Sequence, residues 1–264
     1  MNAGLLAIVR PVSDAMQRCE LTHLDRAPID VALARAQHSA YVDALGRLGC
    51  VVHELPPAQE LPDAVFVEDT AVVLDELAVL TRPGAASRRP EVPAMATALP
   101  RWRPCVSIEA PGTLDGGDVL RIDRTLYVGR TPRSNADGIA MLAAAVAPHG
   151  YRVVAVPVRG CLHLKSAVTL VAPDTLLLNP GWVDPAHWPG LRRVEVDARE
   201  PNAANALGID GRVLMPASFP HTHGRIAAAG LDVVPVDASE VQKAEGGVTC
   251  CSVILRVAQA GFQQ

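Results

Sequence analysis

The sequence lacks the features that mark several large classes of protein. No segment approaches 18 consecutive apolar residues, and the N-terminal MNAGLLAIVRPVSD has neither the basic start nor the long apolar core of a secretory signal. Lysine and arginine total 24 against 28 acidic residues, and the arginines are scattered along the chain, so no basic surface for nucleic acid is expected. We therefore expect a cytoplasmic protein that binds neither membranes nor nucleic acid.

Motifs for common cofactors and for thiol redox chemistry are also missing. The chain has no glycine-rich phosphate loop and no dinucleotide fingerprint, so no cofactor of that kind is expected. Its six cysteines include no Cys-x-x-Cys pair, which argues against a redox protein, and without a signal peptide they are expected to be reduced. Cys161, His163, Cys250 and Cys251 lack the spacing of structural zinc sites, so no metal is expected.

What the chain does contain is a fivefold repeat. Five short β-branched segments, each closed by a turn, are typical of buried strands. They contain Val51, Val106, Val153, Val194 and Val233, at intervals of 39 to 55 residues. With 264 residues, 49% of them hydrophobic, and no low-complexity linker, the chain is expected to form a single domain over residues 1–264.

Helix-like segments precede most of these strands. The clearest is expected from Asp25 to Gly49, with Pro28 near its first turn and the glycine as its C-terminal cap. A second is expected from Asn135 to His149. Strand pairs joined by Asp-Glu, Asp-Arg and Pro-Asp turns complete a strand, strand, helix, strand unit. Such units cannot bury their sheets alone, so they must pack in a line or in a ring, and a ring also removes exposed edges.

In a ring, the connections that follow the five marker strands would occupy equivalent places around one axis. The potentially reactive residues of these connections are Asp63 with Glu68-Asp69, the LDGGD motif from Leu114 to Asp118, His163, Asn205 and Cys250. Each is unremarkable alone, since acidic turns, structural histidines and packed thiols are common. Together, a nucleophile, a base that also serves as acid, and an orienting carboxylate are the minimum set for covalent catalysis through sulfur.

The two adjacent cysteines are distinguished by strand alternation. If the final strand includes them, Cys251 shares a wholly apolar face with Val253 and Leu255, and Cys250 shares a mixed face with Ser252. Cys250 is therefore the better candidate for a site.

Five motifs, FVEDTAVV, TRPGAASRR, LDGGDVL, LHLKS and TCCSVIL, resemble in order and separation those of the dimethylarginine dimethylaminohydrolases. These enzymes are members of the pentein superfamily, which modifies guanidino groups, and the resemblance extends from about Arg10 to Val257. It implies an α/β fold, a five-bladed propeller around a central active site. It also implies hydrolysis of Nω-methylated L-arginine, a small guanidino amino acid, to L-citrulline and a methylamine, without a cofactor.

The resemblance also implies roles for individual residues. Cys250 would be the nucleophile, His163 the general acid and base, and Asp115 the carboxylate that orients His163. The implied substrate-binding residues are Leu21 in a mobile lid, Asp63, Glu68 and Asp69 for the guanidinium and amino groups, Arg88 and Arg133 for the α-carboxylate, and Ala244 for a backbone contact. The alanine is smaller than the apolar residue that the family usually has there, so the pocket is expected to fit the substrate less closely.

Physical chemistry supports these roles. A guanidinium is planar and always charged, so it is best held by carboxylates that accept paired N–H bonds, and the α-carboxylate is best held by arginine. Its carbon resists attack, so a thiolate is required, and a bound cation beside Cys250 would favour that thiolate. The expected reaction passes through an S-alkylthiouronium intermediate, with His163 protonating the departing amine and then activating water.

Two other functions remain open. An arginine or agmatine deiminase would release ammonia, but arginine deiminases are generally longer and have an arginine within the motif that reads FVED here, and agmatine lacks the carboxylate that Arg88 and Arg133 would bind. A non-enzymatic pentein binding protein is the other alternative. The joint presence of Cys250, His163 and Asp115 argues against it.

Overall fold

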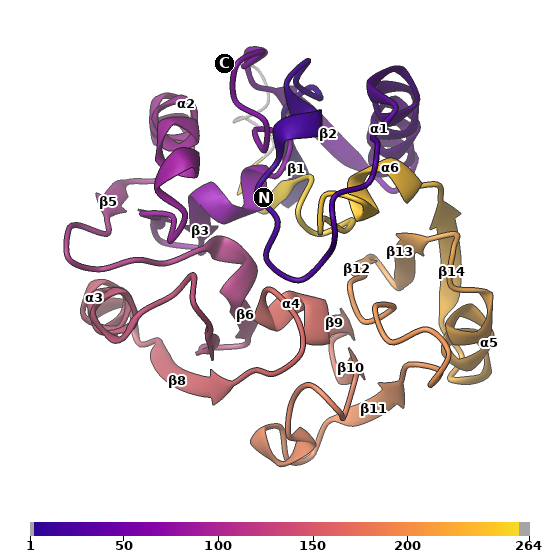
Figure 1. Ribbon diagram of the computed structural model, residues 1–264. Helices are drawn as coiled ribbons and strands as arrows, with labels where there is room; N and C mark the ends of the chain where they lie inside the picture. The colour runs from indigo at the N-terminus through magenta and orange to yellow at the C-terminus, as the bar shows by residue number, and fades with distance from the viewer. Residues whose placement is uncertain (1–2, 259–264) are drawn as a thin grey trace.

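Five three-stranded sheets surround a common centre in residues 3–258, which the computed structural model describes (Figure 1). The sheets comprise β15 (Val253–Ala258), β1 (Ala3–Val9) and β2 (Cys50–Glu54); β3 (Ala71–Val73), β4 (Ala78–Leu80) and β5 (Cys105–Ser107); β6 (Val119–Ile122), β7 (Thr125–Arg130) and β8 (Arg152–Pro157); β9 (Val168–Ala172), β10 (Thr175–Leu178) and β11 (Arg192–Glu195); and β12 (Leu207–Ile209), β13 (Arg212–Pro216) and β14 (Asp232–Val236). The arrangement is that of a five-bladed α/β propeller, as expected.

Every sheet has the same internal order. Its first strand is antiparallel to the middle strand, and the middle strand is parallel to the third, which requires a crossover connection. The crossovers contain α1 (Val31–Arg47); η3 (Ala86–Glu91), α2 (Val92–Ala98) and η4 (Leu99–Arg101); α3 (Ala136–Val146) and η6 (Ala147–His149); η7 (Pro185–His187); and α5 (Pro220–Ala228). The predicted strand, strand, helix, strand unit is confirmed, although the fourth crossover has only the 3-10 turn η7.

The first sheet joins the two ends of the chain. Strand β15 pairs with β1 in an antiparallel register that places Leu6 opposite Leu255. Figure 1 shows the yellow end of the chain beside its indigo beginning. The first sheet therefore takes its first strand from the last described residues.

The hydrophobic core consists of five clusters, and each lies between two neighbouring sheets in the described part of the chain. Strand β1 shows why. Its Leu6 and Ile8 pack toward the second sheet, and its Ala7 and Val9 pack toward the fifth, because successive side chains of a strand point to opposite faces. Each sheet thus buries both faces against its two neighbours, which supports a ring rather than a line.

Two local predictions are wrong. The marker strands are edge strands rather than buried ones, and Val51 and Val106 are 45% and 42% exposed, whereas the middle strands β4 and β10 are fully buried. The first helix begins at Val31 and not near Asp25, because the side chain of Asp30 accepts a hydrogen bond from the N–H of Leu33 and caps the helix there.

The other helix predictions hold. Helix α1 ends just before Gly49, whose φ is 90°, and the segment of α3 and η6 ends at Gly150, whose φ is 77°. The side chain of Asn135 caps α3 by accepting a hydrogen bond from the N–H of Gly138. Among residues 3–258, every helix is too short or too polar to span a membrane.

Candidate active site

Short turns lead into the first strand of each sheet and hold the potentially reactive residues. They are η2 (Val67–Thr70) before β3, η5 (Gly116–Asp118) before β6, α4 (Leu164–Ala167) before β9, the loop of Asn205 before β12, and the turn at Cys250 before β15. Figure 1 shows α4 near the centre of the ring, with β6 and β9 beside it. The sequence-based expectation that these connections occupy equivalent places agrees with this arrangement.

Hydrogen bonds link the five turns in succession. The N–H of Gly117 donates to Oδ1 of Asp69 over 2.9 Å, and the N–H of Leu164 donates to Oδ1 of Asp118 over 3.0 Å. The side-chain amide of Asn205 donates to the carbonyl oxygen of Lys165 over 3.2 Å.

The links then return to the first turn. The N–H of Thr249 donates to Oδ1 of Asn205 over 3.0 Å, and the N–H of Glu68 donates to the carbonyl oxygen of Cys250 over 3.1 Å. Residues from all five repeats are therefore held in one network at the centre of the molecule.

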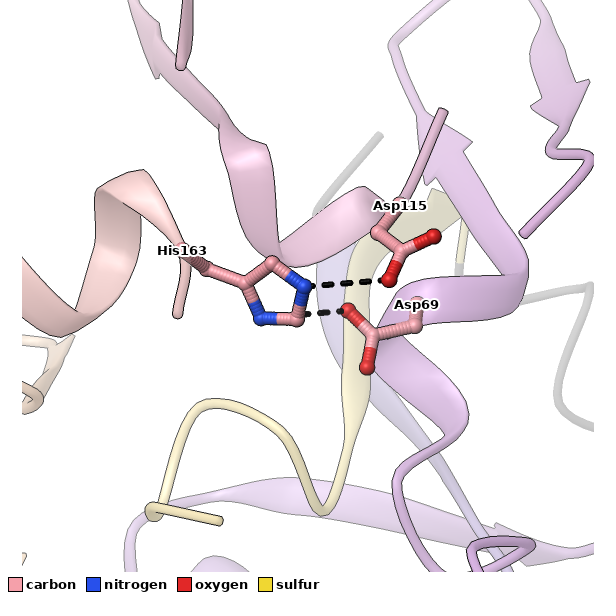
Figure 2. A group of neighbouring side chains, drawn as sticks. All are labelled: Asp69, Asp115 and His163. Carbon is pink, nitrogen blue, oxygen red and sulfur yellow. Dashed lines mark hydrogen bonds and ion pairs between the residues drawn. The ribbon is translucent and has the colours of Figure 1, made fainter. Parts of the chain in front are cut away.

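His163 lies beside two carboxylates, and Figure 2 shows both of them on the same side of its ring. Its Nε2 atom is 3.0 Å from Oδ2 of Asp115, and its Nδ1 atom is 3.9 Å from Oδ1 of Asp69. All three side chains are buried. Burial disfavours the imidazolium, but Asp69, Asp115 and Asp118 outweigh that effect and raise the pKa of His163 to about 9. The histidine is therefore a cation at neutral pH.

The two carboxylates are themselves held by other donors. Asp115 accepts a hydrogen bond from the N–H of Gly84 over 2.9 Å. Burial opposes the ionisation of Asp69, but His163 and Arg88 outweigh it and lower the pKa of this carboxyl group. Asp69 is therefore an anion beside the imidazolium.

A small pocket joins these groups to the thiol of Cys250. Of the residues implied as catalytic or substrate-binding, it is lined by Asp63, Asp69, Arg88, Arg133, His163, Ala244 and Cys250. Asp115 lies behind His163, and Leu21 packs at the edge of the hydrophobic cluster that contains Cys250. The fold thus brings residues from four of the five repeats to one cavity.

The thiol of Cys250 is neutral in this environment. Burial, together with the charges of Glu68 and Asp69, raises its pKa to about 12. The N–H of Gly247 donates to the sulfur over 3.4 Å. The free protein thus combines a neutral thiol with a protonated His163.

Cys250 and Cys251 differ as predicted, but not for the predicted reason. Strand β15 begins at Val253, so neither cysteine belongs to it, and strand alternation does not separate them. The turn directs Cys250 to the pocket with His163, whereas Cys251 lines a separate small cavity with Tyr41.

Glu68 lies away from the pocket. Its carboxylate accepts hydrogen bonds from Nζ of Lys165 over 2.5 Å and from Oγ1 of Thr249 over 2.8 Å. It lines a different cavity, together with Lys165 and Thr249. Burial raises the pKa of Glu68, and the charge of Lys165 opposes that rise. The structure thus separates Glu68 from Asp63 and Asp69, with which the sequence grouped it.

The two arginines of the pocket are engaged differently. Arg88 donates from Nη1 to Oδ2 of Asp69 over 2.6 Å, and it donates from Nε and Nη2 to the two carboxylate oxygens of Glu91 over 3.2 and 2.8 Å. Arg133 donates from Nη2 to Oγ1 of Thr22 over 3.1 Å. Its Nη1 atom is buried and has no hydrogen-bond partner among residues 3–258, so it can donate to an anionic ligand.

Residues 20–24 lie beside the pocket, which Glu20 lines, and are fixed by two carboxylates. The N–H of Glu20 donates to both oxygens of Asp63, over 3.3 and 3.1 Å. The N–H groups of Thr22, His23 and Leu24 all donate to Oε1 of Glu245, over 2.9, 2.5 and 2.6 Å. Sequence reasoning missed this anchor, because no local pattern relates Glu245 to a segment more than 220 residues away.

One group of side chains in the described range has the geometry to hold a metal ion. Oxygens of Asp69 and Asp115 and a ring nitrogen of His163 lie within 4.8 Å of one another. A metal ligand must be a neutral imidazole, whereas the pKa of His163 is raised to about 9. At neutral pH the group therefore favours a proton over a metal.

Comparisons with known proteins identify relatives along most of the chain. The family model described as "N,N dimethylarginine dimethylhydrolase, eukaryotic" matches residues 13–186. A Streptomyces coelicolor protein named N(G),N(G)-dimethylarginine dimethylaminohydrolase is 45% identical over 252 residues, which are 95% of this chain and 96% of the relative. A Pseudomonas aeruginosa protein of the same name is 36% identical over 226 residues, which are 85% of this chain and 89% of the relative.

Solved structures give the same result. A cysteine-to-serine mutant of dimethylarginine dimethylaminohydrolase from Pseudomonas aeruginosa, complexed with citrulline, superposes with a TM-score of 0.90 at 33% identity and covers 96% of this chain and 100% of its own. The N-terminal domain of ArgZ, an arginine dihydrolase from cyanobacteria, has a TM-score of 0.86 at 21% identity, with 97% and 98% coverage. At that identity, the second match indicates a shared fold only.

Proposed function

The chain belongs to the dimethylarginine dimethylaminohydrolase family, and from this premise we propose that Cys250, His163 and Asp115 hydrolyse Nω-methylated L-arginine to L-citrulline and a methylamine. The protein is a hydrolase of guanidino C–N bonds. The observation that carries the residue assignment is that Cys250 lines the same pocket as a histidine held 3.0 Å from Asp115.

The ionisation state of the free protein suits the first step. His163 carries a proton and Cys250 is a neutral thiol, with pKa values of about 9 and about 12. A substrate guanidinium beside the sulfur lowers the pKa of the thiol, so the proton leaves to solvent when the cation binds. The substrate thus activates its own nucleophile.

The reaction then proceeds in two halves. The thiolate of Cys250 forms a bond to the guanidinium carbon, the bond from this carbon to the methylated nitrogen breaks, and His163 transfers its proton to the departing amine. An S-alkylthiouronium intermediate remains. The neutral histidine next takes one proton from water as the water oxygen bonds to the carbon. The C–S bond then breaks, and the second proton of the water goes to the departing sulfur, which gives citrulline and restores the neutral thiol. Asp115 keeps the imidazole oriented throughout.

Substrate binding is assigned to the remaining residues of the pocket. Asp63 and Asp69 accept the amino and guanidinium N–H groups, and Arg133 donates to the α-carboxylate from Nη1, which has no hydrogen-bond partner in the described residues and lies 3.8 Å from Asp115, with Arg88 as the second cation. Leu21 belongs to the segment that covers the pocket, and Ala244 contributes its backbone. Glu68 acts at longer range, as an anion behind Asp69, because Lys165 and Thr249 occupy its carboxylate.

We further propose that residues 1–264 form one domain. Each described sheet packs against two neighbours, so a part of the ring removed from the rest would expose apolar clusters.

The experiment that tests the activity is a parallel incubation with asymmetric dimethylarginine, monomethylarginine, arginine and agmatine. Citrulline and the released amine are measured together. The methylated arginines are expected to turn over fastest, and agmatine is expected to be slow because it offers no carboxylate to Arg133. Faster turnover of plain arginine would favour a deiminase, and no product from any substrate would favour a binding protein.

A further inference from the structure

Buried charges of alternating sign extend through the pocket and beyond it. In order they are Glu91, Arg88, Asp69, His163, Asp115 and Arg133, and the separations between successive charged atoms are 2.8, 2.6, 3.9, 3.0 and 3.8 Å. None of the six side chains exposes more than 8% of its surface. The proposed reaction uses five of these residues and leaves Glu91 without a role.

Glu91 controls the plane of the Arg88 guanidinium. Its two carboxylate oxygens accept hydrogen bonds from Nε and Nη2 of Arg88, and this paired geometry fixes a guanidinium most firmly. Both residues belong to η3, so this pairing is local. With one edge of the guanidinium occupied by Glu91, the remaining nitrogen, Nη1, is directed at Oδ2 of Asp69.

Asp69 depends on that donor for its orientation. Arg88 holds its Oδ2 atom, and the N–H of Gly117 holds its Oδ1 atom, which lies 3.9 Å from Nδ1 of His163. These two donors on opposite oxygens fix the carboxylate in the rotamer that faces the imidazolium.

We propose that Glu91 is a positioning residue for the reaction: it holds Arg88 on Asp69, and so keeps Asp69 directed at His163 and at the substrate guanidinium. Glu91 itself is not among the described residues that line the pocket, so it acts through Arg88. The effect on the substrate guanidinium rests on the proposed function. The effect on His163 does not, because the contacts among Arg88, Asp69 and His163 exist without substrate.

The charged groups around Glu91 determine how loss of its carboxylate would affect Arg88 and His163. Burial raises the pKa of Glu91 to about 7, Arg88 opposes that rise, and Asp63 and Asp69 add to it. Arg10 is a second buried cation whose charge interacts with Glu91. Without Glu91, these cations are less compensated, and Nη2 of Arg88 keeps only the carbonyl oxygens of Phe66 and Asp63 as acceptors, over 3.2 and 3.5 Å. The guanidinium is then held less firmly against Asp69. Both changes disfavour the imidazolium form of His163.

The test is Glu91→Gln, which preserves size and removes the charge, with activity measured at pH 8, where Glu91 is mostly ionised in the wild type. We expect kcat for asymmetric dimethylarginine to fall about tenfold or more. The NMR titration of His163 is expected to shift to lower pH. The matched control is Glu200→Gln, which removes another buried carboxylate, one that accepts the N–H groups of His221 and Thr222. In this control, kcat per folded molecule and the His163 titration are expected to stay as in the wild type.

Removing one charge of a buried pair can destabilise the fold, so the comparison also uses a double-variant cycle. If Glu91 acts through Arg88, Glu91→Gln has little further effect on kcat in an Arg88→Gln background. An equal effect in both backgrounds would overturn the proposal, as would an unshifted His163 titration in folded Glu91→Gln. The titration needs no turnover, so it tests Glu91 even if the wild type released no citrulline, a result that would overturn the proposed function instead.

Discussion

The Nε2 atom of His163 lies 3.0 Å from Oδ2 of Asp115, and Oδ1 of Asp69 faces the other ring nitrogen at 3.9 Å. Two acids on one buried imidazole make it a cation, with its pKa raised to about 9. In the proposed reaction the histidine therefore begins as the acid that protonates the amine and becomes a base only afterwards.

This pairing predicts a pH-dependent contribution to stability. An unfolded histidine has a pKa of about 6.5. Because the folded pKa is higher, the stabilisation is fully present below about pH 6.5 and is lost as the pH rises through about 9. The difference in unfolding free energy between the wild type and His163→Gln should shrink by about 3 kcal/mol over this range. Urea unfolding at a series of pH values measures it, and a constant difference would contradict the prediction.

The two adjacent cysteines should respond differently to serine. Cys250→Ser is expected to abolish citrulline formation, because a hydroxyl is a much weaker nucleophile than a thiolate. Cys251→Ser places a hydroxyl beside Tyr41 in a mainly apolar cavity, so it should lower the unfolding free energy by about 1–2 kcal/mol and keep kcat per folded molecule. Amine release and thermal unfolding are measured for both variants. Equal loss of activity in the two would show that the cysteines are not distinguished in this way.

The reactivity of Cys250 should depend on the charge of the reagent. Its raised pKa, about 12, predicts slow alkylation by a neutral haloacetamide at pH 7. A haloacetamidine carries a cation that Asp69 attracts, and this charge favours the thiolate. Each rate is divided by the rate of the same reagent with a free thiol, and mass spectrometry identifies the labelled residue, with Cys250→Ser as control. Equal normalised rates would rule out activation by a bound cation.

Glu245 should govern residues 22–24, which belong to the segment that we propose covers the pocket. Its carboxylate accepts three successive N–H groups, from Thr22 to Leu24, so Glu245→Gln should raise KM for asymmetric dimethylarginine about tenfold and speed amide exchange in residues 22–24. The matched control is Glu240→Gln. The carboxylate of Glu240 accepts a hydrogen bond from the N–H of Asp30 and forms an ion pair with Lys243. Unchanged exchange in residues 22–24 of Glu245→Gln would contradict the prediction.

Features that depend on neighbouring residues could be predicted from the sequence. The glycines that follow α1 and α3 stop these helices through their left-handed backbone, and the Asp-Arg turn separates β6 from β7. The sequence pattern places the start of α1 too early, because the preference of Pro28 for a first turn competes with the capping side chain of Asp30, and the cap determines where the helix begins.

Features that depend on distant residues could not be predicted. Glu68 and Asp69 are adjacent in the chain, yet Glu68 pairs with Lys165 and Asp69 pairs with Arg88 and faces His163. Backbone geometry directs neighbouring side chains to different sides. Only the packing of the five sheets determines which residue each side chain meets. The anchors made by Glu91 and Glu245 belong to the same class, since nothing in the sequence beside them identifies what they bind.

By itself, the sequence determined the order of strands and helices, the fivefold repetition and the residue types available for chemistry, because periodicity and turn preference act over a few residues. The tertiary structure alone decided which acids face the thiol, which cysteine enters the pocket and which strands are exposed. These outcomes depend on contacts between segments far apart in the chain, where burial removes water and makes each charge depend on its neighbours.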